Sequence, residues 1–357
     1  CHYCYVGQHC TDVQRKTIEP HKYSSTWIAG ALSLEKLGGR AIVNFCAHGE
    51  TLILPQNLEY IRMILAAGHF VMIVSNMTQT KAISKLLELP PEQISRLFFK
   101  CSFHWLELKR LKLLDTFAKN VNNAWKTGAS ITVEITPSDE LEPHIPEIKS
   151  YSLKTFGALP HITIPRDEIH GYEMLTKHTP AEYAKIWGQF DSPLFDFKMS
   201  IWGKKVKDFC YAGDWGYSIN MASGDIFRCS SRGHIGNLSN DRMPRKPVCR
   251  KCPFPHCYNG HFWEIFGMVP TIKTPTFANM RDRRRKDGTH WLRPRMIKAF
   301  TSKTTDTRRP YSKLKENLLN ILTRKKNRQN PSLWRRLRHF KFQHLRHWQK
   351  NIIRKIK

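Results

Sequence analysis

Short apolar runs alternate with longer amphipathic segments across the first half of the chain. The runs are rich in Val, Ile and Phe, as strands buried on both faces should be, and they cover residues 41–45, 69–75, 97–102, 130–136 and 161–165. Between them, apolar residues spaced three or four apart predict helices at residues 58–67, 80–89, 105–126 and 139–151. This alternation predicts an α/β fold with a parallel sheet, either open or closed into a barrel, with functional groups at the carboxyl ends of its strands.

The pattern changes near residue 198, after a predicted helix at residues 181–190. Residues 201–267 are rich in Gly, aromatic residues and Cys, and this segment is too short for a large apolar core, so a metal would supply stability. Beyond it, basic clusters predict a linker that leads into a basic helical tail. We therefore expect three parts: residues 1–200, 201–267 and 268–357.

The charge of the chain is unevenly distributed. The formal net charge is +29, but residues 281–357 hold 26 Lys and Arg against four acidic residues, a net charge of +22, which leaves +7 for residues 1–280. The basicity therefore belongs to an appendage, and the globular part needs no polyanionic partner. The sequence has no apolar run of eighteen residues and opens on cysteines, which argues against a membrane-spanning helix or signal peptide and predicts a cytoplasmic protein. The missing initiator Met suggests a fragment.

Ten cysteines fall mainly into two groups. Cys1, Cys4 and Cys10 form the first, and the second consists of Cys210, Cys229, Cys249, Cys252 and Cys257. A secreted disulfide scaffold would be short and dense in cysteine throughout, so metal ligation in a reducing compartment is favoured. The isolated Cys46 and Cys101 lie in apolar runs and are expected to be small buried hydrophobes.

The first cysteine group has a specific context. Cys1-His2-Tyr3-Cys4 alone would suit zinc, a redox dithiol or an iron–sulfur cluster, but it precedes a βα series whose first visible strand leads into Gly49-Glu50. Together these features resemble the radical S-adenosylmethionine superfamily, whose motif is C-x3-C-x2-C with an aromatic residue before the last Cys, and whose second strand ends in Gly-Gly-Glu-Pro. Cys1, Tyr3 and Cys4 match the last three fixed positions. The first Cys would lie four residues before Cys1, so we expect an N-terminally truncated chain. His48 and Thr51 depart from the glycine motif.

The resemblance implies a partial (β/α)6 TIM-like barrel that lacks its first strand. Three thiolates, those of Cys1 and Cys4 among them, would hold a [4Fe–4S] cluster whose open iron binds S-adenosylmethionine. Reductive cleavage would give a 5′-deoxyadenosyl radical, which takes hydrogen from a peptide or small polar substrate and leads to oxidation, epimerisation or crosslinking. The protein would bind and orient the reactants, and an electron donor such as flavodoxin or ferredoxin would be needed.

The resemblance also assigns roles at the cofactor site. Tyr3 would pack near the adenine, and the backbone around Gly49 and Glu50 would meet the methionine ammonium, since glycine permits close approach. Polar contacts to the cofactor would come from Ser75, Asn76 and Ser102. Taken singly, Tyr3 could be a core aromatic residue, Gly49 a turn glycine and Glu50 an acid at a helix N-terminus. Cys10 is an alternative third ligand.

The second cysteine group also resembles a known arrangement. Cys210 is followed by thirteen residues, Gly224, four residues and Cys229, and then by Cys249-x2-Cys252. This order is similar to the twitch version of the SPASM auxiliary-cluster extension, with Cys257 as a further SPASM-like position. This implies one auxiliary [4Fe–4S] cluster. Residues 218–220 and 225–228 predict a hairpin with Gly224 in its turn, which would bring Cys210 and Cys229 together. A structural zinc site is the alternative, because four thiolates also satisfy tetrahedral zinc.

The tail has apolar residues three to five apart among basic ones, which predicts an amphipathic helix. These residues are Trp334, Leu337, Phe340, Leu345, Trp348, Ile352 and Ile356. Such a helix could lie on an anionic membrane surface, which would place the protein at the inner membrane face. Nucleic-acid binding is a weaker hypothesis. The third alternative is a solvated extension. The rival to the radical enzyme is a non-enzymatic zinc-binding protein associated with nucleic acid.

Overall fold

The computed structural model describes most of the chain. Its described residues are 4, 7–8, 21–47, 49–229, 232–250, 252–258, 274–303 and 308–328, with backbone only at 232 and 324–328. The predictions for Cys1, Tyr3, His48, Cys10 and the tail beyond residue 328 lie outside the described residues. No helix in the described part is both long and apolar enough to cross a bilayer.

The first half forms the predicted parallel sheet. Its strands are β1 (Ile42–Phe45), β2 (Phe70–Ser75), β3 (Leu97–Ser102), β4 (Ser130–Ile135) and β5 (His161–Ile162). They lie side by side in chain order, and every neighbouring pair is parallel. Sequential order places all the connecting helices on one face, as in a barrel, so the sheet is a partial TIM-like barrel. The α/β prediction is confirmed. The predicted bounds of β1 to β4 agree within one residue, whereas β5 ends three residues earlier than predicted.

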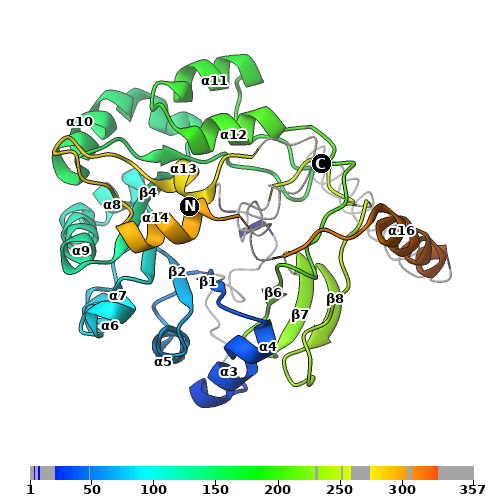
Figure 1. Cartoon of the computed structure of the whole chain (residues 1–357). Coiled ribbons are helices and arrows are strands. Elements are labelled where there is room, and N and C mark those ends of the chain that lie inside the picture. Colours follow the sequence, from blue (N-terminus) through cyan, green and yellow to red (C-terminus); the bar gives the residue numbers. More distant parts are fainter. Residues whose placement is uncertain are drawn as a thin grey trace, which may run out of the picture.

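Helices cover the outer face of this sheet (Figure 1). They are α5 (Pro55–Ala66), α6 (Thr80–Leu87), α7 (Pro91–Ile94), α8 (Trp105–Arg110), α9 (Leu114–Thr127), the 3-10 helix η1 (Asp139–His144) and α10 (Ile145–Phe156). The single helix predicted at residues 105–126 is two helices, because Lys112 adopts a left-handed φ of 55° that ends α8. Before β1 come the short α3 (Ser25–Ala31) and α4 (Leu34–Leu37).

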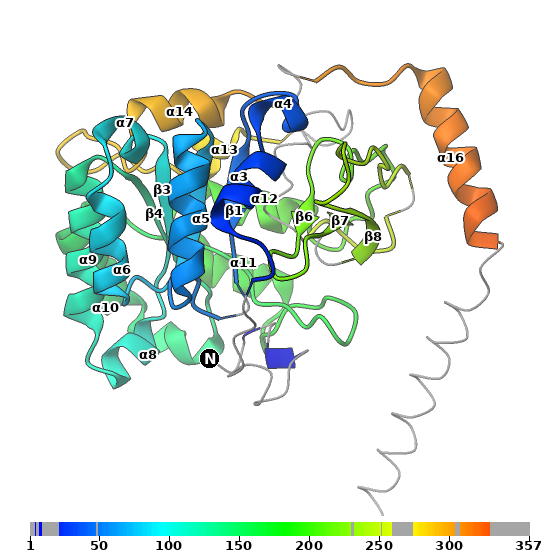
Figure 2. The same cartoon turned by 90° about the horizontal axis from the view of Figure 1, so that it is seen from below.

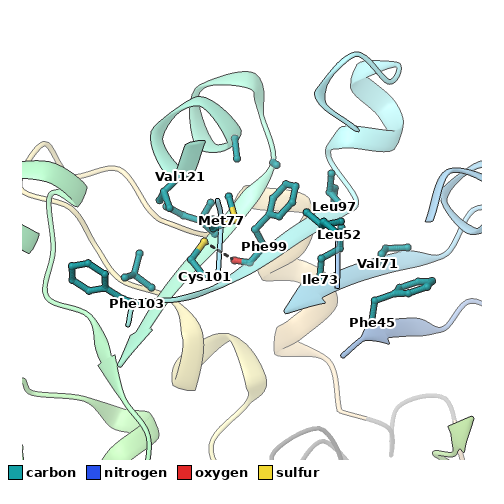
Figure 3. Packing of buried hydrophobic residues seen from close by; sticks show 14 of the residues in the cluster. Phe45, Leu52, Val71, Ile73, Met77, Leu97, Phe99, Cys101, Phe103 and Val121 are labelled. Carbon is teal, nitrogen blue, oxygen red and sulfur yellow. Dashed lines mark hydrogen bonds between the residues drawn. The ribbon is translucent and has the colours of Figure 1, made fainter. Parts of the chain in front are cut away.

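The strand alternation separates two apolar layers. Val71, Ile73, Phe99 and Cys101 point toward the outer helices and form the main core (Figure 3). Cys101 is fully buried there, as predicted, whereas Cys46 is exposed and the prediction of burial is wrong for it. Cys46 follows the last residue of β1, where the chain has already left the sheet.

The inner face of the sheet is covered by elements from later in the chain. These are α12 (Pro193–Ile201), α13 (Phe277–Arg281) and α14 (Pro294–Thr301). Helix α11 (Pro180–Gly188) packs against α12, and its buried Tyr183 and Trp187 belong to the main core. Phe98 of β3 meets Phe300 of α14 edge to face, with ring centroids 5.3 Å apart, and both belong to the second apolar cluster.

A linker is expected from about residue 271 onward, but residues 274–303 pack against the barrel. The Trp291 indole is fully buried and donates a hydrogen bond of 3.0 Å to the Phe156 carbonyl. Arg285 stacks on Trp125 with its guanidinium 4.1 Å from the ring centroid. The basic residues at the start of the supposed appendage therefore belong to the folded protein, because their stems and guanidinium groups pack on aromatic and carbonyl groups.

A small antiparallel sheet carries the second cysteine group. It consists of β6 (Ser218–Ile219), β7 (Asp225–Cys229) and β8 (Arg232–Asn237). The predicted hairpin is confirmed, with Gly224 in its turn at a φ of 79°, where a Cβ atom would also lie 2.7 Å from Tyr23. Helix α16 (Lys313–Arg328) lies beside this sheet (Figure 2), and Tyr211 donates a hydrogen bond of 2.9 Å to Glu316 on it.

Candidate functional site

Glu50 is held at the carboxyl end of β2. Its carboxylate accepts hydrogen bonds from the Ser75 hydroxyl at 2.8 Å and the Asn76 backbone N–H at 2.7 Å. A third comes from the Leu52 N–H at 3.1 Å. Because parallel strands end at one edge of the sheet, β1 and β2 bring these predicted residues together.

Burial governs the electrostatics of this carboxylate. Loss of solvent raises the pKa of Glu50, and the hydrogen bonds from Asn76, Leu52 and Ser75 oppose that rise without cancelling it. The site therefore holds a carboxylate that would gain from a positively charged partner, since such a partner compensates for lost hydration.

Ser75 and Asn76 have structural partners of their own. The Ser75 oxygen also accepts a hydrogen bond of 2.9 Å from the Met77 N–H. The Asn76 side-chain oxygen accepts bonds from the Thr78 N–H at 3.0 Å and the Thr78 hydroxyl at 2.7 Å. These contacts fix the turn after β2 and so fix Glu50. Contact of either side chain with a cofactor stays a prediction.

The residues on either side of Glu50, Gly49 and Thr51, each have a structural role. Gly49 has a φ of 137°, and a Cβ atom there would meet nothing within 4 Å, so backbone conformation requires the glycine while the space beside it stays open. Thr51 is one of the two positions that depart from the glycine motif described above. Its hydroxyl is buried and donates a hydrogen bond of 2.6 Å to the Val74 carbonyl near the end of β2, which ties the Glu50 turn to the neighbouring strand.

The turn after β2 also contains a strained residue. Met77 is fully buried with a φ of 54°, a left-handed conformation that costs roughly 1–2 kcal/mol for a residue with a Cβ atom. The Asn120 amide stabilises it by donating a hydrogen bond of 2.8 Å to the Met77 carbonyl. Strain that the surroundings hold in place is typical of functional sites.

Ser102 lies farther along the same edge. It ends β3 and is opposite Glu134 in the β3–β4 ladder. The His104 N–H donates a hydrogen bond of 3.2 Å to the Ser102 carbonyl. The structure therefore joins Ser75 and Asn76 to Glu50 but leaves Ser102 beside a different acid.

The segment after Cys4 is attached to this carboxyl edge. Gln8 donates a hydrogen bond of 2.9 Å to the Arg166 carbonyl and accepts one of 2.7 Å from the Glu168 N–H. Both partners follow β5. Cys4 is three residues before Gly7, whose N–H donates to the Cys4 carbonyl at 2.9 Å, so Cys4 and Gln8 belong to one local turn. Cys4 thus lies in a turn that is attached to the edge of the sheet that carries Glu50.

The second cysteine group is brought together by backbone pairing. Cys210 and Cys249 exchange two backbone hydrogen bonds of 2.9 and 3.1 Å. Burial, and then the neighbouring thiols of Cys229, Cys252 and Cys249, raise the pKa of Cys210 to about 12. Several thiolates cannot form so close together in a buried site unless a cation compensates, which is what a metal centre does. Cys249 is buried with a φ of 62°, a second strained residue.

The spacing of these thiols distinguishes two kinds of metal centre. Four thiolates at about 2.3 Å from one zinc ion would lie about 3.8 Å apart. In the described chain no three ligand atoms of this group lie within 4.8 Å of one another, whereas Asp139, Glu142 and His178 do. The five cysteines are therefore spread more widely than a single zinc ion requires.

A buried group of cations was missed by the sequence analysis. Lys100 on β3 forms an ion pair of 3.2 Å with Glu134 on β4, and Arg281 of α13 pairs with the same carboxylate. Glu134 and Arg281 are each only 3% exposed. Burial, with the Arg281 and Arg166 charges, lowers the pKa of Lys100 to about 7. The sequence signal for this group was Lys100 within a β-rich run. The charge distribution alone places Arg281 in the basic appendage.

Comparisons with known proteins give likenesses to solved structures. SuiB of Streptococcus suis has 13% identity over 62% of this chain and 58% of its own, with a TM-score of 0.44. The structure of SuiB bound to S-adenosylmethionine has 12% identity over 68% of this chain and 61% of its own, with a TM-score of 0.47. Native anSMEcpe with bound AdoMet has 11% identity over 68% of this chain and 75% of its own, with a TM-score of 0.47. The chain thus spans about three fifths of SuiB. A scan against protein-family models and a search of curated proteins found no match.

Proposed function

We propose that this protein is a radical S-adenosylmethionine enzyme. The observation that carries the proposal is the meeting of two sequence signals at one edge of a parallel sheet. Gln8, in the turn that begins at Cys4, is hydrogen-bonded to the residues after β5. Glu50 follows β1 and is hydrogen-bonded to Ser75 at the end of β2, on the same edge. A cluster and a cofactor that must react with each other require this proximity.

The donor set fits the implied groups. Cys1 and Cys4, with an upstream Cys, would hold a [4Fe–4S] cluster, which supplies the electron that cleaves bound S-adenosylmethionine reductively to a hydrogen-abstracting radical. Glu50 would face the ammonium of the cofactor, because no cation pairs with its partly buried carboxylate in the part of the chain that the structure describes. Gly49 would leave room for that approach, and Ser75 and Asn76 would keep the Glu50 carboxylate in place.

The second cysteine group supports an auxiliary iron–sulfur cluster of the twitch type. Cys210, Cys229, Cys249 and Cys252 are the proposed ligands, with Cys257 as a further candidate. Their wide spacing favours a polynuclear cluster over one zinc ion, and the backbone pairing of Cys210 with Cys249 supports a shared centre. A peptide or small polar substrate and a flavodoxin or ferredoxin donor would complete the reaction.

The test uses the full-length gene product, reconstituted anaerobically with iron and sulfide and then reduced. Its Cys4→Ser variant should lose formation of methionine and 5′-deoxyadenosine from S-adenosylmethionine, measured by chromatography. Cys101→Ala is the matched control, because Cys101 is buried in the outer core and contacts no proposed ligand. Cleavage that survives Cys4→Ser, or that is absent from the wild type, would reject the proposal.

A membrane surface is a second candidate partner, favoured by α16. Four apolar side chains on this helix are exposed: Leu314 (81%), Leu318 (55%), Ile321 (52%) and Leu322 (53%). They recur at the spacing of one helix face, with Lys313 and Lys315 near the start of the helix and a basic run from Arg324 at its end. An exposed apolar stripe flanked by cations is typical of helices that lie in an anionic lipid interface. We propose that α16 docks the enzyme on such a surface at the inner membrane face.

A further inference from the structure

A group of metal-type ligands lies outside the sites described above. Asp139 and Glu142 belong to the 3-10 helix η1, and His178 lies just before α11. Their two carboxylates and one imidazole bring three ligand atoms within 4.8 Å of one another. The two acids follow β4 and the histidine follows β5, so the group comes from the segments that leave the carboxyl ends of two neighbouring strands. It contains none of the cysteines.

The spacing of these atoms suits one metal ion. At bond lengths of roughly 2.1–2.2 Å, the ligand atoms around a divalent cation lie about 3.0–4.3 Å apart, so small side-chain movements would close this group around an ion. His178 Nε2 and Glu142 Oε1 are hydrogen-bonded at 2.5 Å. A metal ion would take the place of the proton between them, as happens whenever imidazole and carboxylate ligands bind a metal.

Backbone and hydroxyl contacts hold the ligands in place. The Asp139 carboxylate accepts hydrogen bonds from the Thr176 hydroxyl at 2.6 Å and from the Lys177 N–H at 2.8 Å. The Thr176 oxygen in turn accepts a hydrogen bond of 3.2 Å from the His178 N–H. The segment before α11 is thereby tied to η1, and outer contacts that orient the ligands are typical of metal sites.

A buried hydroxyl without a partner stands beside the first ligand. Ser138 precedes Asp139 and is 4% exposed, and its Oγ atom has no hydrogen-bond partner among the residues that the structure describes. Ser138 is the N-cap residue of η1, but its side chain does not cap the helix, although serine at this position normally does so. Its hydroxyl is therefore left over by the fold.

A second unpartnered hydroxyl comes from α11. Tyr183 is fully buried, and its hydroxyl also lacks a hydrogen-bond partner in the described part of the chain. It is the fourth residue of α11, and His178 precedes the N-cap Thr179. Side chains at these two positions often pack against each other where a helix begins. Burial raises the pKa of Tyr183, and the Asp139 and Glu142 charges raise it further, as expected for a hydroxyl near both carboxylates. A buried polar atom without a partner marks a place where a ligand atom can bind.

We propose that Asp139, Glu142 and His178 bind one divalent transition-metal ion, and that the Ser138 and Tyr183 hydroxyls bind oxygen ligands held by that ion. Two carboxylates with one imidazole favour Mn²⁺, Fe²⁺ or Zn²⁺ over Ca²⁺ and Mg²⁺, which prefer oxygen ligands throughout. Three protein ligands leave coordination positions open for water or a substrate oxygen, as catalytic metal sites do. The site does not depend on the proposed enzyme function.

The experiment uses Mn²⁺ as the probe, because this ion prefers oxygen and nitrogen ligands to thiolates. The anaerobically reconstituted full-length protein is titrated with Mn²⁺, and the free ion is measured by electron paramagnetic resonance. Wild type should bind about one Mn²⁺ per chain. Zn²⁺ should displace it, since Zn²⁺ binds such ligands more tightly.

Variants locate the ion. His178→Gln should weaken Mn²⁺ binding by about tenfold or more, because a ligand is lost. His170→Gln is the matched control and should bind Mn²⁺ as wild type does. His170 forms an imidazole–carboxylate pair of 2.8 Å with Asp167, but in the described chain no third ligand atom lies within 4.8 Å of both.

Tyr183→Phe keeps the test decisive if His178→Gln does not fold. The metal-free Tyr183→Phe protein should be at least as heat-stable as wild type by circular dichroism, because the hydroxyl that it loses has no partner. Its Mn²⁺ affinity should fall several-fold.

The inference is overturned if wild type binds no Mn²⁺, or if the His178→Gln and His170→Gln proteins bind it equally well. The three side chains would then only tie the segment before α11 to η1. Cleavage of S-adenosylmethionine is measured in the same preparations. Cleavage can fail while Mn²⁺ binding persists, and Mn²⁺ binding can fail while cleavage persists, so the failure of one proposal is distinguishable from the failure of the other.

Discussion

Replacing Glu134 by Gln should severely destabilise the protein. Glu134 is 3% exposed, and among the residues that the structure describes it is the one carboxylate paired with both Lys100 and Arg281. Gln has nearly the same shape but no charge, so the substitution leaves two buried cations without their anion. Breaking a buried ion pair by removing one partner costs about 3–5 kcal/mol.

Glu147→Gln supplies the matched control. Glu147 forms an ion pair of 2.8 Å with Lys109, but the two side chains are 52% and 42% exposed. An exposed pair contributes about 0–1 kcal/mol. The same chemical change is therefore made in two ion pairs of similar length that differ in burial.

Thermal unfolding of reconstituted protein at pH 6 would measure the difference. At roughly 2–4 °C per kcal/mol for a domain of this size, Glu134→Gln should lower the midpoint by about 6–20 °C and Glu147→Gln by no more than about 4 °C. The Glu134→Gln deficit should shrink at pH 9, because Lys100, with its pKa lowered to about 7, is neutral there. Equal shifts in the two variants at pH 6 would refute the reasoning.

Three further perturbations test other parts of the account. Thr51→Val should cost about 1–3 kcal/mol in urea unfolding, because the buried Val74 carbonyl loses its donor, and Thr51→Ser should lose less. Lys100 keeps its proton in the unfolded chain up to its ordinary pKa, but the folded protein releases that proton near pH 7. The wild-type free energy of unfolding should therefore rise between about pH 7 and about pH 10.4. Lys100→Met should show a shallower rise, and an identical slope would contradict the lowered pKa of Lys100. Leu318→Asp should reduce sedimentation with anionic lipid vesicles several-fold at an unchanged unfolding midpoint, since the side chain is exposed; undiminished sedimentation would exclude docking through α16.

The parts of the fold that depend on local pattern were predictable from the sequence. Buried strands have dense runs of β-branched and aromatic residues, and parallel topology then requires Glu50, Ser75 and Asn76 to converge. The hairpin around Gly224 followed from the same kind of local signal. The break at Lys112 was not predictable, because a left-handed residue inside an otherwise helical pattern leaves no trace in the spacing of apolar residues.

The buried ion-pair group of Lys100, Glu134 and Arg281 could not be predicted, because its members are far apart in the chain. Lys100 and Arg281 are joined only through tertiary packing of α13 against the inner face of the sheet. A run of basic residues after Arg281 looks like a solvated segment when charge alone is counted. Only the contacts show that Arg281 is buried and that Arg285 lies on Trp125.

The central claim is that this chain is an iron–sulfur enzyme with two clusters, and metal analysis tests it most directly. Full-length protein purified and reconstituted without oxygen should contain about eight iron and eight sulfide per chain. It should hold no stoichiometric zinc. A colourless protein with one zinc per chain and no iron would contradict the account.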